Sequence, residues 1–349
     1  MTESRLITLG VIGCGRIAQA AHLPAIEKAA GVRLVAVSDP SPQLSSGVGA
    51  RYGVESFTDT ADLLRLDLDA VLIATPDRFH LPLGLAALAA GKHVLMEKPL
   101  ASTAADAEAL VSAARSAGVS LQTGSMKRHD PGLEFAHAAR SKIGRVLSMS
   151  SWYRVMSATR LDIQSTLFPS IIIDETVRRR ETEFKANGLA YRLATHGAHL
   201  FDGLRYLVGD LDWLSARSAS VANDFTWHGS AGISDGGGLA SFEISVDVHS
   251  QWSEGVDIFG EHGHIKARSP YVFSKLGSTV EVFVENEGTA TVPAFADTNP
   301  FKRQVESFAR AITSGVTTNP TPEDGLAAVQ LIEAAAASAA DGGRPVLLR

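Results

Sequence analysis

The sequence contains one cysteine, Cys14, and no long basic stripe. A lone cysteine cannot form an internal disulfide, which favours a reducing compartment. Lys and Arg number 32 against 38 Asp and Glu, a balance that does not favour nucleic-acid binding. No apolar run approaches the ~18 residues that cross a bilayer, and the first residues lack the pattern of a signal peptide. We therefore expect a cytoplasmic protein with neither a membrane nor a nucleic-acid partner.

What the sequence does contain is a regular alternation of strand and helix patterns in its first third. The expected strands cover 6–12, 33–38, 71–74, 93–96 and 119–122, and the expected helices 17–30, 59–66, 81–90 and 103–117. This alternation predicts a doubly wound parallel sheet with right-handed crossovers. The length of 349 residues suits two domains, and we place the first at residues 1–125.

The pattern changes near residue 126, where long strand-like stretches begin to dominate. They cover 146–155, 214–221, 239–248, 256–260 and 279–284, with helical stretches at 197–207 and 302–314. The alternation of apolar and polar residues in ASFEISVDV is typical of an antiparallel sheet with one covered face. We therefore expect a second α/β domain over residues 126–349.

Two segments of this second domain stand out. The helix expected over about 321–341 is well marked, because Thr321 can cap its start, and it is placed to pack back near the first domain. Residues 156–190 follow neither the helical nor the strand pattern. Long irregular segments of compact domains are usually functional, and we keep two alternatives for this one, a lid and an oligomer contact.

The stretch GCGRIA lies between the first expected strand and the first expected helix. Gly13 permits a tight turn, Gly15 lets a pyrophosphate approach the backbone, and Ala18 lets the helix pack close to the strand. The pyrophosphate would then bind at the start of the helix, beside Arg16 and Ile17.

Asp39 follows the second expected strand. A carboxylate at that point accepts hydrogen bonds from ribose hydroxyls and repels a 2′-phosphate. The sequence therefore predicts binding of NAD, with NADP less favoured.

Two more motifs begin where strands of the parallel sheet end. The residues of interest in ATPDRFH and EKP are Thr75, Pro76, His80, Glu97 and Lys98. Ligands of doubly wound sheets bind beyond the carboxyl ends of the strands. We therefore expect both motifs to converge with the glycine turn and Asp39 on one rim that holds the cofactor.

These motifs together carry a resemblance to a known family. GVIGCGRIAQ, VLIATPDRFH, AGKHVLMEKPLA and THGAHLFDGLRYLVGD resemble motifs of the Gfo/Idh/MocA family of sugar and polyol oxidoreductases, and EHGHIKA and the closing helix resemble parts of its second domain. The resemblance covers nearly the whole chain. It implies an N-terminal Rossmann domain that binds NAD(P), joined to an α/β domain with a large open, mainly antiparallel sheet that often mediates dimer or tetramer contacts.

The resemblance also implies roles for single residues. Lys98 of the EKP motif is expected between nicotinamide and substrate, and His199 is expected to be the general acid/base of a D-x-x-x-H-x-x-D pattern that ends at Asp202. The first Asp of that pattern falls on Thr195, a departure that removes one carboxylate. His196 is a candidate substitute, although it points about 100° further round a helix.

The oxidation of an alcohol requires the same two kinds of group, whatever the resemblance. Oxidation of a secondary alcohol removes a proton, which an imidazole can accept near neutral pH, and an ammonium stabilises the developing alkoxide. Arg128, Tyr153, Arg154 and Arg192 are further candidates for contact with substrate hydroxyls, although each suits an ordinary structural position equally well. The histidines at 262 and 264 supply only two ligands, so no metal site is expected.

The sequence therefore predicts an NAD-dependent dehydrogenase that moves a hydride between a secondary hydroxyl of a sugar, inositol or related polyol and the nicotinamide. Two alternatives stay open. One is hydrolysis or elimination with retained NAD and no net NADH, and the other is a non-catalytic NAD or sugar sensor, which the departure at Thr195 allows. The expected partners are a small-molecule polyol and further copies of the chain, in a homodimer or homotetramer formed through the C-terminal sheet.

Overall fold

The computed structural model describes residues 5–156, 168, 170–185, 188–221, 224–248, 251–274 and 276–348. The chain divides into two compact units. The first unit comprises Met1–Ser125, Phe168–Gly188 and Phe301–Val329. The second unit comprises Met126–Leu167, Leu189–Pro300 and Gln330–Arg349. Two segments beyond the expected boundary at 125/126 thus belong to the first unit, because they pack on its sheet and helices.

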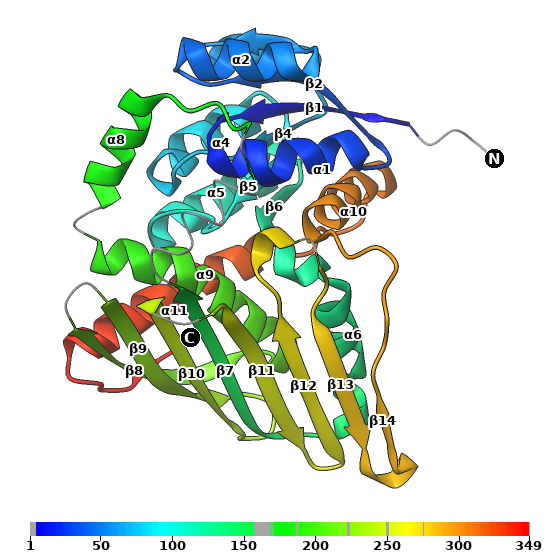
Figure 1. Ribbon diagram of the computed structural model, residues 1–349, viewed down its shortest axis with the longest axis vertical. Coiled ribbons are helices and arrows are strands. Elements are labelled where there is room, and N and C mark those ends of the chain that lie inside the picture. The colour runs from blue at the N-terminus through cyan, green and yellow to red at the C-terminus, as the bar shows by residue number, and fades with distance from the viewer. Residues whose placement is uncertain are drawn as a thin grey trace. The chain divides into compact units, whose positions relative to one another are not determined.

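The first unit is built on a parallel sheet of six strands in the order β3-β2-β1-β4-β5-β6 (Figure 1). The strands are β1 Ile7–Ile12, β2 Val32–Ser38, β3 Glu55–Phe57, β4 Ala70–Ile73, β5 His93–Glu97 and β6 Leu121–Gly124. The chain order reverses between β1 and β4, and such a switch point opens a crevice at the carboxyl ends of the strands. All four residues of β4 are buried, as expected for a strand that is covered on both faces.

Helices cover both faces of this sheet. They are α1 Leu23–Lys28, α2 Pro42–Tyr52, α3 Thr60–Leu64, α4 His80–Ala89, α5 Ala104–Ala117 and α10 Pro300–Ser314. The same unit also contains α8 Glu175–Lys185, which has no buried residues. A π-helical turn, η1 (Ala18–His22), leads into α1, and a 3-10 turn, η2 (Asp77–Phe79), leads into α4. The ends of α5 show how the sequence sets these bounds, since Thr103 accepts a hydrogen bond from the Asp106 N–H and Gly118 adopts a left-handed φ of 65°.

The second unit contains a nine-stranded sheet in the order β14-β13-β12-β11-β7-β10-β9-β8-β15. The strands are β7 Val146–Met156, β8 Leu211–Val221, β9 Asp224–Ile233, β10 Leu239–Val248, β11 Ser253–Gly260, β12 Gly263–Ser269, β13 Thr279–Val284, β14 Thr289–Thr291 and β15 Val346–Leu347. All neighbouring pairs are antiparallel except β7 and β10, which run parallel. The predicted class, a Rossmann unit with a second α/β unit on a large, mainly antiparallel sheet, is confirmed.

Among the described residues, helices cover one face of the nine-stranded sheet. The helices are α6 Pro131–Ala139, α9 Leu189–Val208 and the later turns of α11 Pro322–Ala340 (Figure 1). Inward side chains such as Phe242 and Trp227 form a buried core with Phe201 of α9. The other face is exposed, as Ser150 and Phe259 are, which is the usual condition of an antiparallel sheet.

The structure describes part of the segment 156–190, for which no regular pattern was predicted. Residues 170–174 run without regular structure into α8, and α9 begins at Leu189, eight residues earlier in the chain than the predicted helix start at 197. The remainder of the prediction, on residues 157–167, 169, 186 and 187, lies outside the described residues.

Candidate active site

The turn after β1 has the backbone geometry of a loop that admits an anion. Gly13 has a φ of 96°, and a Cβ built on it would lie 2.8 Å from the Ala74 carbonyl oxygen, so only glycine fits. A Cβ on Gly15 would meet no atom within 4 Å, so the backbone there borders open space. Arg16 is exposed and Ile17 half-buried in the turn that follows. The turn can therefore admit a pyrophosphate against the main chain.

Asp39 lies at the end of β2, directly beside this turn. One carboxylate oxygen accepts the Cys14 N–H at 2.8 Å and the other accepts the Ser41 N–H at 2.9 Å. Burial raises the pKa of Asp39, and the nearby Asp174 raises it further, against the lowering effect of the two hydrogen bonds. Burial also raises the pKa of the Cys14 thiol to about 12, which makes this free cysteine an inert packing group.

The loop after β4 offers one unsatisfied polar atom and one engaged histidine. The Thr75 hydroxyl oxygen is buried and has no hydrogen-bond partner within the described part of the chain. Pro76 follows and leads into η2. His80 is predicted from the sequence to contact the cofactor, but its two ring nitrogens lie 2.9 Å from the Pro99 carbonyl and 3.0 Å from the Thr75 carbonyl. We therefore assign His80 a positioning role, linking the loops after β4 and β5.

Glu97 and Lys98 follow β5, and they differ in environment. The Glu97 carboxylate is buried, with one oxygen 2.6 Å from His22 Nε2 and the other accepting the Lys98 N–H at 3.0 Å. Burial alone would raise the pKa of Glu97, but the hydrogen bond from His22 and the nearby Lys98 bring it below its ordinary value. Glu97 thus holds the backbone of Lys98 in place, and its contact with a cofactor stays a prediction. His22 is a supporting residue that no sequence motif reveals.

These features of the first unit fit a dinucleotide. The glycine turn leaves room for a pyrophosphate, Asp39 stands where the adenosine ribose of a Rossmann cofactor lies, and the Thr75 hydroxyl is a buried group in need of a partner. The residues present are therefore able to hold NAD.

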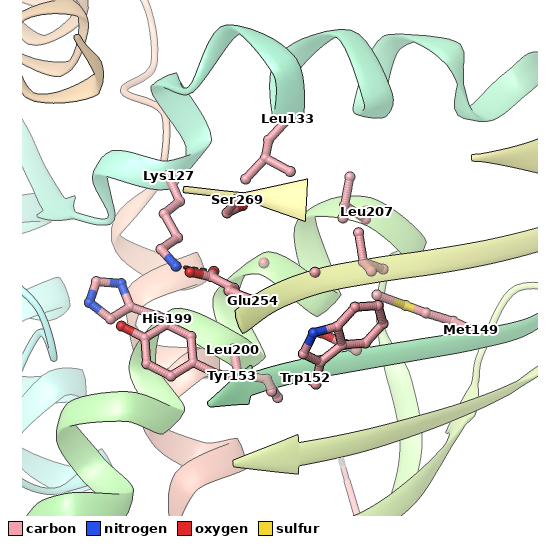
Figure 2. A pocket seen from close by; sticks show the side chains of 14 residues that line it. Lys127, Leu133, Met149, Trp152, Tyr153, His199, Leu200, Leu207, Glu254 and Ser269 are labelled. Carbon is pink, nitrogen blue, oxygen red and sulfur yellow. Dashed lines mark hydrogen bonds and ion pairs between the residues drawn. The ribbon is translucent and has the colours of Figure 1, made fainter. Parts of the chain in front are cut away.

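The second unit gathers a separate set of polar side chains around Tyr153 (Figure 2). The ring of His199 stacks on the ring of Tyr153 with centroids 5.6 Å apart, and the ring of His196 lies at the same distance. The Lys127 ammonium lies 4.5 Å from the centre of the Tyr153 ring. The two histidines are three residues apart on α9 and therefore share one helix face. Tyr153, His196 and His199, all predicted from the sequence, thus meet in one place.

A carboxylate that the sequence does not reveal completes this cluster. Glu254 of β11 forms an ion pair with Lys127 and lines the same pocket as Tyr153 and His199 (Figure 2). Burial raises the pKa of Glu254, against the lowering effect of Lys127. Its second oxygen is buried and has no hydrogen-bond partner among the residues that the structure describes. The strand predicted here begins only at 256, so Glu254 falls outside every expected element.

Arg128 and Asp202 are both predicted to contact substrate, and the structure pairs them with each other. Arg128 Nε lies 3.0 and 3.1 Å from the two carboxylate oxygens of Asp202, and both side chains are buried. The Arg128 guanidinium also lies 5.0 Å from the ring centre of Tyr206. The pair therefore ties the segment before α6 to α9, which carries His199.

The remaining predicted substrate contacts are scattered. Arg154 pairs with Glu243 and points to the face of the sheet opposite Tyr153, because successive side chains of a strand alternate. Arg192 forms an ion pair with Asp247, which sits at a bulge of β10 with a φ of 64°. Thr195 is half-buried on α9, one turn before His199. The structure thus does not bring Arg154 to the cluster.

Metal binding and membrane insertion are two further properties on which the described residues bear. No three His, Cys, Asp or Glu side chains among them come together as a set of metal ligands. No helix in the described ranges has the length and apolar character needed to span a bilayer.

Comparison with known proteins agrees with this geometry. Residues 7–125 match the Gfo/Idh/MocA family model, described as an oxidoreductase family with an NAD-binding Rossmann fold. The inositol 2-dehydrogenase of Rubrobacter xylanophilus is 31% identical over 286 residues, which cover 76% of this chain and 72% of the relative. The inositol 2-dehydrogenase of Rhizobium meliloti is 27% identical over 357 residues, 96% of this chain and 97% of the relative.

A solved structure extends the likeness of the fold over both units. The oxidoreductase from Agrobacterium radiobacter, in complex with NAD+, L-tartaric acid and magnesium, matches with a TM-score of 0.77 and 22% identity over 98% of each chain. The fold and the glycine turn define a Rossmann-type oxidoreductase. The chain belongs to the Gfo/Idh/MocA family.

Proposed function

We propose that this protein oxidises a secondary hydroxyl of a neutral polyol, such as an inositol or a sugar, with NAD as the hydride acceptor. The observation that carries the proposal is the cluster in the second unit, where a buried lysine–carboxylate pair lies beside the stacked rings of Tyr153 and His199. The inositol 2-dehydrogenases among the relatives support the choice of substrate class.

His199 is the proton acceptor in this proposal. An imidazole titrates near neutral pH and can take the proton of the reacting hydroxyl. The stacked ring of Tyr153 and the ion pair between Arg128 and Asp202 hold the histidine and its helix in place. Lys98, held by Glu97 at the carboxyl end of β5, supplies the positive charge that stabilises a developing alkoxide. NAD, when bound, supplies the nicotinamide ring that accepts the hydride.

Glu254 takes the place of the carboxylate that the sequence lacks at Thr195. Its second oxygen is a buried acceptor in need of a donor, and a substrate hydroxyl provides one. The charge of Lys127 is already balanced by Glu254, and a substrate carboxylate here would face the like charge of Glu254. The pocket therefore favours neutral polyols over sugar acids.

The choice of NAD over NADP follows from Asp39. Its carboxylate stands at the end of β2, where it accepts hydrogen bonds from ribose hydroxyls and repels a 2′-phosphate.

We also propose that the exposed face of the nine-stranded sheet joins copies of the chain into a dimer or tetramer. This face carries a cross-strand row formed by Phe259, His264 and Phe283.

The test is an assay of NADH formation with NAD and a panel of inositols, neutral sugars and uronates. We expect NADH from neutral polyols and slower or absent reaction with uronates. Glu254→Gln should raise the KM for a neutral polyol about tenfold to a hundredfold, the cost of losing a hydrogen bond to a charged group, with kcat changed less than about threefold.

Glu285→Gln is the matched control, because Glu285 is an exposed carboxylate of the same unit, and its KM should be unchanged. An unchanged KM in Glu254→Gln would remove that residue from the substrate site. Consumption of substrate without net NADH would instead support the alternative in which NAD is retained. A His199→Ala variant that keeps wild-type turnover would refute the assignment of the base.

A further inference from the structure

Residues 170–185, which we call the strap, pack on the first unit although they follow β7 of the second. Gln19, in the turn of helix after the glycine loop, makes two hydrogen bonds of 2.9 Å with the main chain of Ile172, one to its carbonyl and one from its N–H. The same amide group donates to the Cys14 carbonyl at 2.8 Å. One side chain therefore joins the strap to the glycine turn.

The strap also contacts elements on either side of the glycine turn. On the α2 side, Gln43 donates to the Ile173 carbonyl at 3.2 Å, and a Cβ on Gly47 would lie 2.7 Å from Ile172 Cδ1. On the side of η2, Arg78 pairs with Glu181 of α8, the green helix of Figure 1. The strap therefore bridges loops that follow the carboxyl ends of β1, β2 and β4, where a Rossmann unit binds its dinucleotide.

The strap places a second carboxylate beside Asp39. Ser41 connects the two acids, since its N–H donates to Asp39 at 2.9 Å and its hydroxyl donates to Asp174 at 2.7 Å. Asp174 is near enough to raise the pKa of Asp39 by its charge. The hydrogen bond from Ser41 lowers the pKa of Asp174 itself, and Asp174 also caps α8 by accepting the N–H groups of Thr176 and Val177.

We propose that Asp174 is a specificity-determining residue for the cofactor, a second negative charge that the strap holds beside the ribose site so that a 2′-phosphate is rejected. The inference rests on the proposed use of NAD and adds a residue to that site. A phosphate bound beside Asp39 would meet two carboxylates instead of one. The repulsion from Asp174 would add to the repulsion from Asp39.

The experiment is a titration of the protein with NADH and with NADPH, followed by the fluorescence of the bound cofactor. Wild type should bind NADH at least about a hundredfold more tightly than NADPH. Asp174→Asn keeps a capping side chain and removes the charge. In this variant we expect NADPH to bind about tenfold more tightly, because its 2′-phosphate then meets one carboxylate instead of two, and NADH to change less than about threefold.

Glu183→Gln is the matched control, since Glu183 is an exposed carboxylate on the same helix. The preference of this variant for NADH over NADPH should equal that of wild type. Asp174→Ser, which also caps a helix without a charge, serves if the asparagine variant does not fold, and it should show the same gain for NADPH. The gain should shrink in high salt, which screens repulsion between charges near the surface.

Two results would overturn the inference. One is an unchanged preference in both Asp174 variants, and the other is an equal loss of affinity for NADH and NADPH, which is the effect of a purely structural cap. Failure of the proposed use of NAD has a different signature, because wild type would then bind neither cofactor or would itself prefer NADPH.

Discussion

At the scale of single residues, the buried pair formed by His22 and Glu97 supports Lys98, to which we assign a catalytic role. His22 is 1% exposed and its ring packs edge-on to Phe301 with centroids 5.3 Å apart. Glu97 accepts the Lys98 N–H with its other oxygen. A buried carboxylate that loses its partner is left as an uncompensated charge, which is strongly destabilising.

We predict that His22→Leu lowers the free energy of unfolding by about 3 kcal/mol at neutral pH, as removal of one partner of a buried pair does. The pKa of Glu97 lies below its ordinary value in the fold, so its stabilising effect is present above about pH 4.3 and is lost as the pH falls through the folded pKa. The cost of the substitution should therefore shrink in acid. Urea unfolding at several pH values measures this.

His22→Gln is the control for this prediction, because its amide keeps a donor toward Glu97. It should cost clearly less than His22→Leu at neutral pH. Equal costs for the two variants, or a cost independent of pH, would show that His22 contributes packing alone.

The functional role of a residue could be predicted from the sequence where a motif surrounds that residue. Lys98 and His199 stand in such motifs, and His199 lies in the polar cluster of the second unit. Glu254 stands in none, and it joins the cluster only through its ion pair with Lys127, which lies 127 positions away in the chain. His80 has a motif, yet the direction of its ring depends on where the Pro99 carbonyl lies.

At the scale of elements, the two glycines in the turn between β1 and the first helix meet different requirements, one of backbone conformation and one of open space. Gly13 is needed for the backbone, because its φ is 96° and a side chain would meet the Ala74 carbonyl. Gly15 has no such conflict, since a Cβ there would reach open space. The second glycine is thus kept free for a ligand and not for the fold.

We predict opposite outcomes for alanine at these two positions. Gly15→Ala should keep a melting temperature within about 2 °C of wild type and weaken NADH binding by about tenfold or more, because the methyl group occupies the space of the pyrophosphate. Gly13→Ala should lose about 2 kcal/mol or more of stability through strain. Calorimetry and NADH titration measure both. Unchanged NADH affinity in Gly15→Ala would place the cofactor elsewhere.

Strands and helices were predictable to different degrees. The expected strand at 93–96 and helix at 103–117 match β5 and α5 closely, because each has its own periodicity and end signals. The pattern missed α2 and β9, whose apolar residues are sparse. It also gave no sign that β7 and β10 run parallel within an antiparallel sheet, because strand direction is set by distant pairing.

At the scale of the whole molecule, the exposed face of the nine-stranded sheet is the surface that we assign to self-association. Phe259 is 45% exposed, and it pairs across strands with His264, whose ring stacks near Phe283 with centroids 5.4 Å apart. An exposed aromatic row on an open sheet is typical of a surface that another protein covers.

We predict that wild type is a dimer or tetramer and that Phe259→Lys shifts it toward monomer. The reason is that the contact would then bury a charge in place of an aromatic ring. Burial of that ring stabilises the contact by about 1.5–3 kcal/mol for each copy. Light scattering coupled to gel filtration measures the mass. Val316→Lys, at an exposed position of the first unit, is the control and should leave the mass unchanged. A monomeric wild type would contradict the assignment.

The alternation of strands and helices in the first unit, the glycine turn and the placement of Asp39 and Lys98 at strand ends could all be predicted from the sequence. These features depend on neighbours in the chain, through periodicity, caps and the rule that ligands bind at the carboxyl ends of parallel strands. Three contacts became visible only in the folded chain: Glu254 faces Lys127, Arg154 faces away from Tyr153, and the strap brings Asp174 to Asp39. Contacts of this kind join residues far apart in sequence, and they exist only once the whole chain has packed.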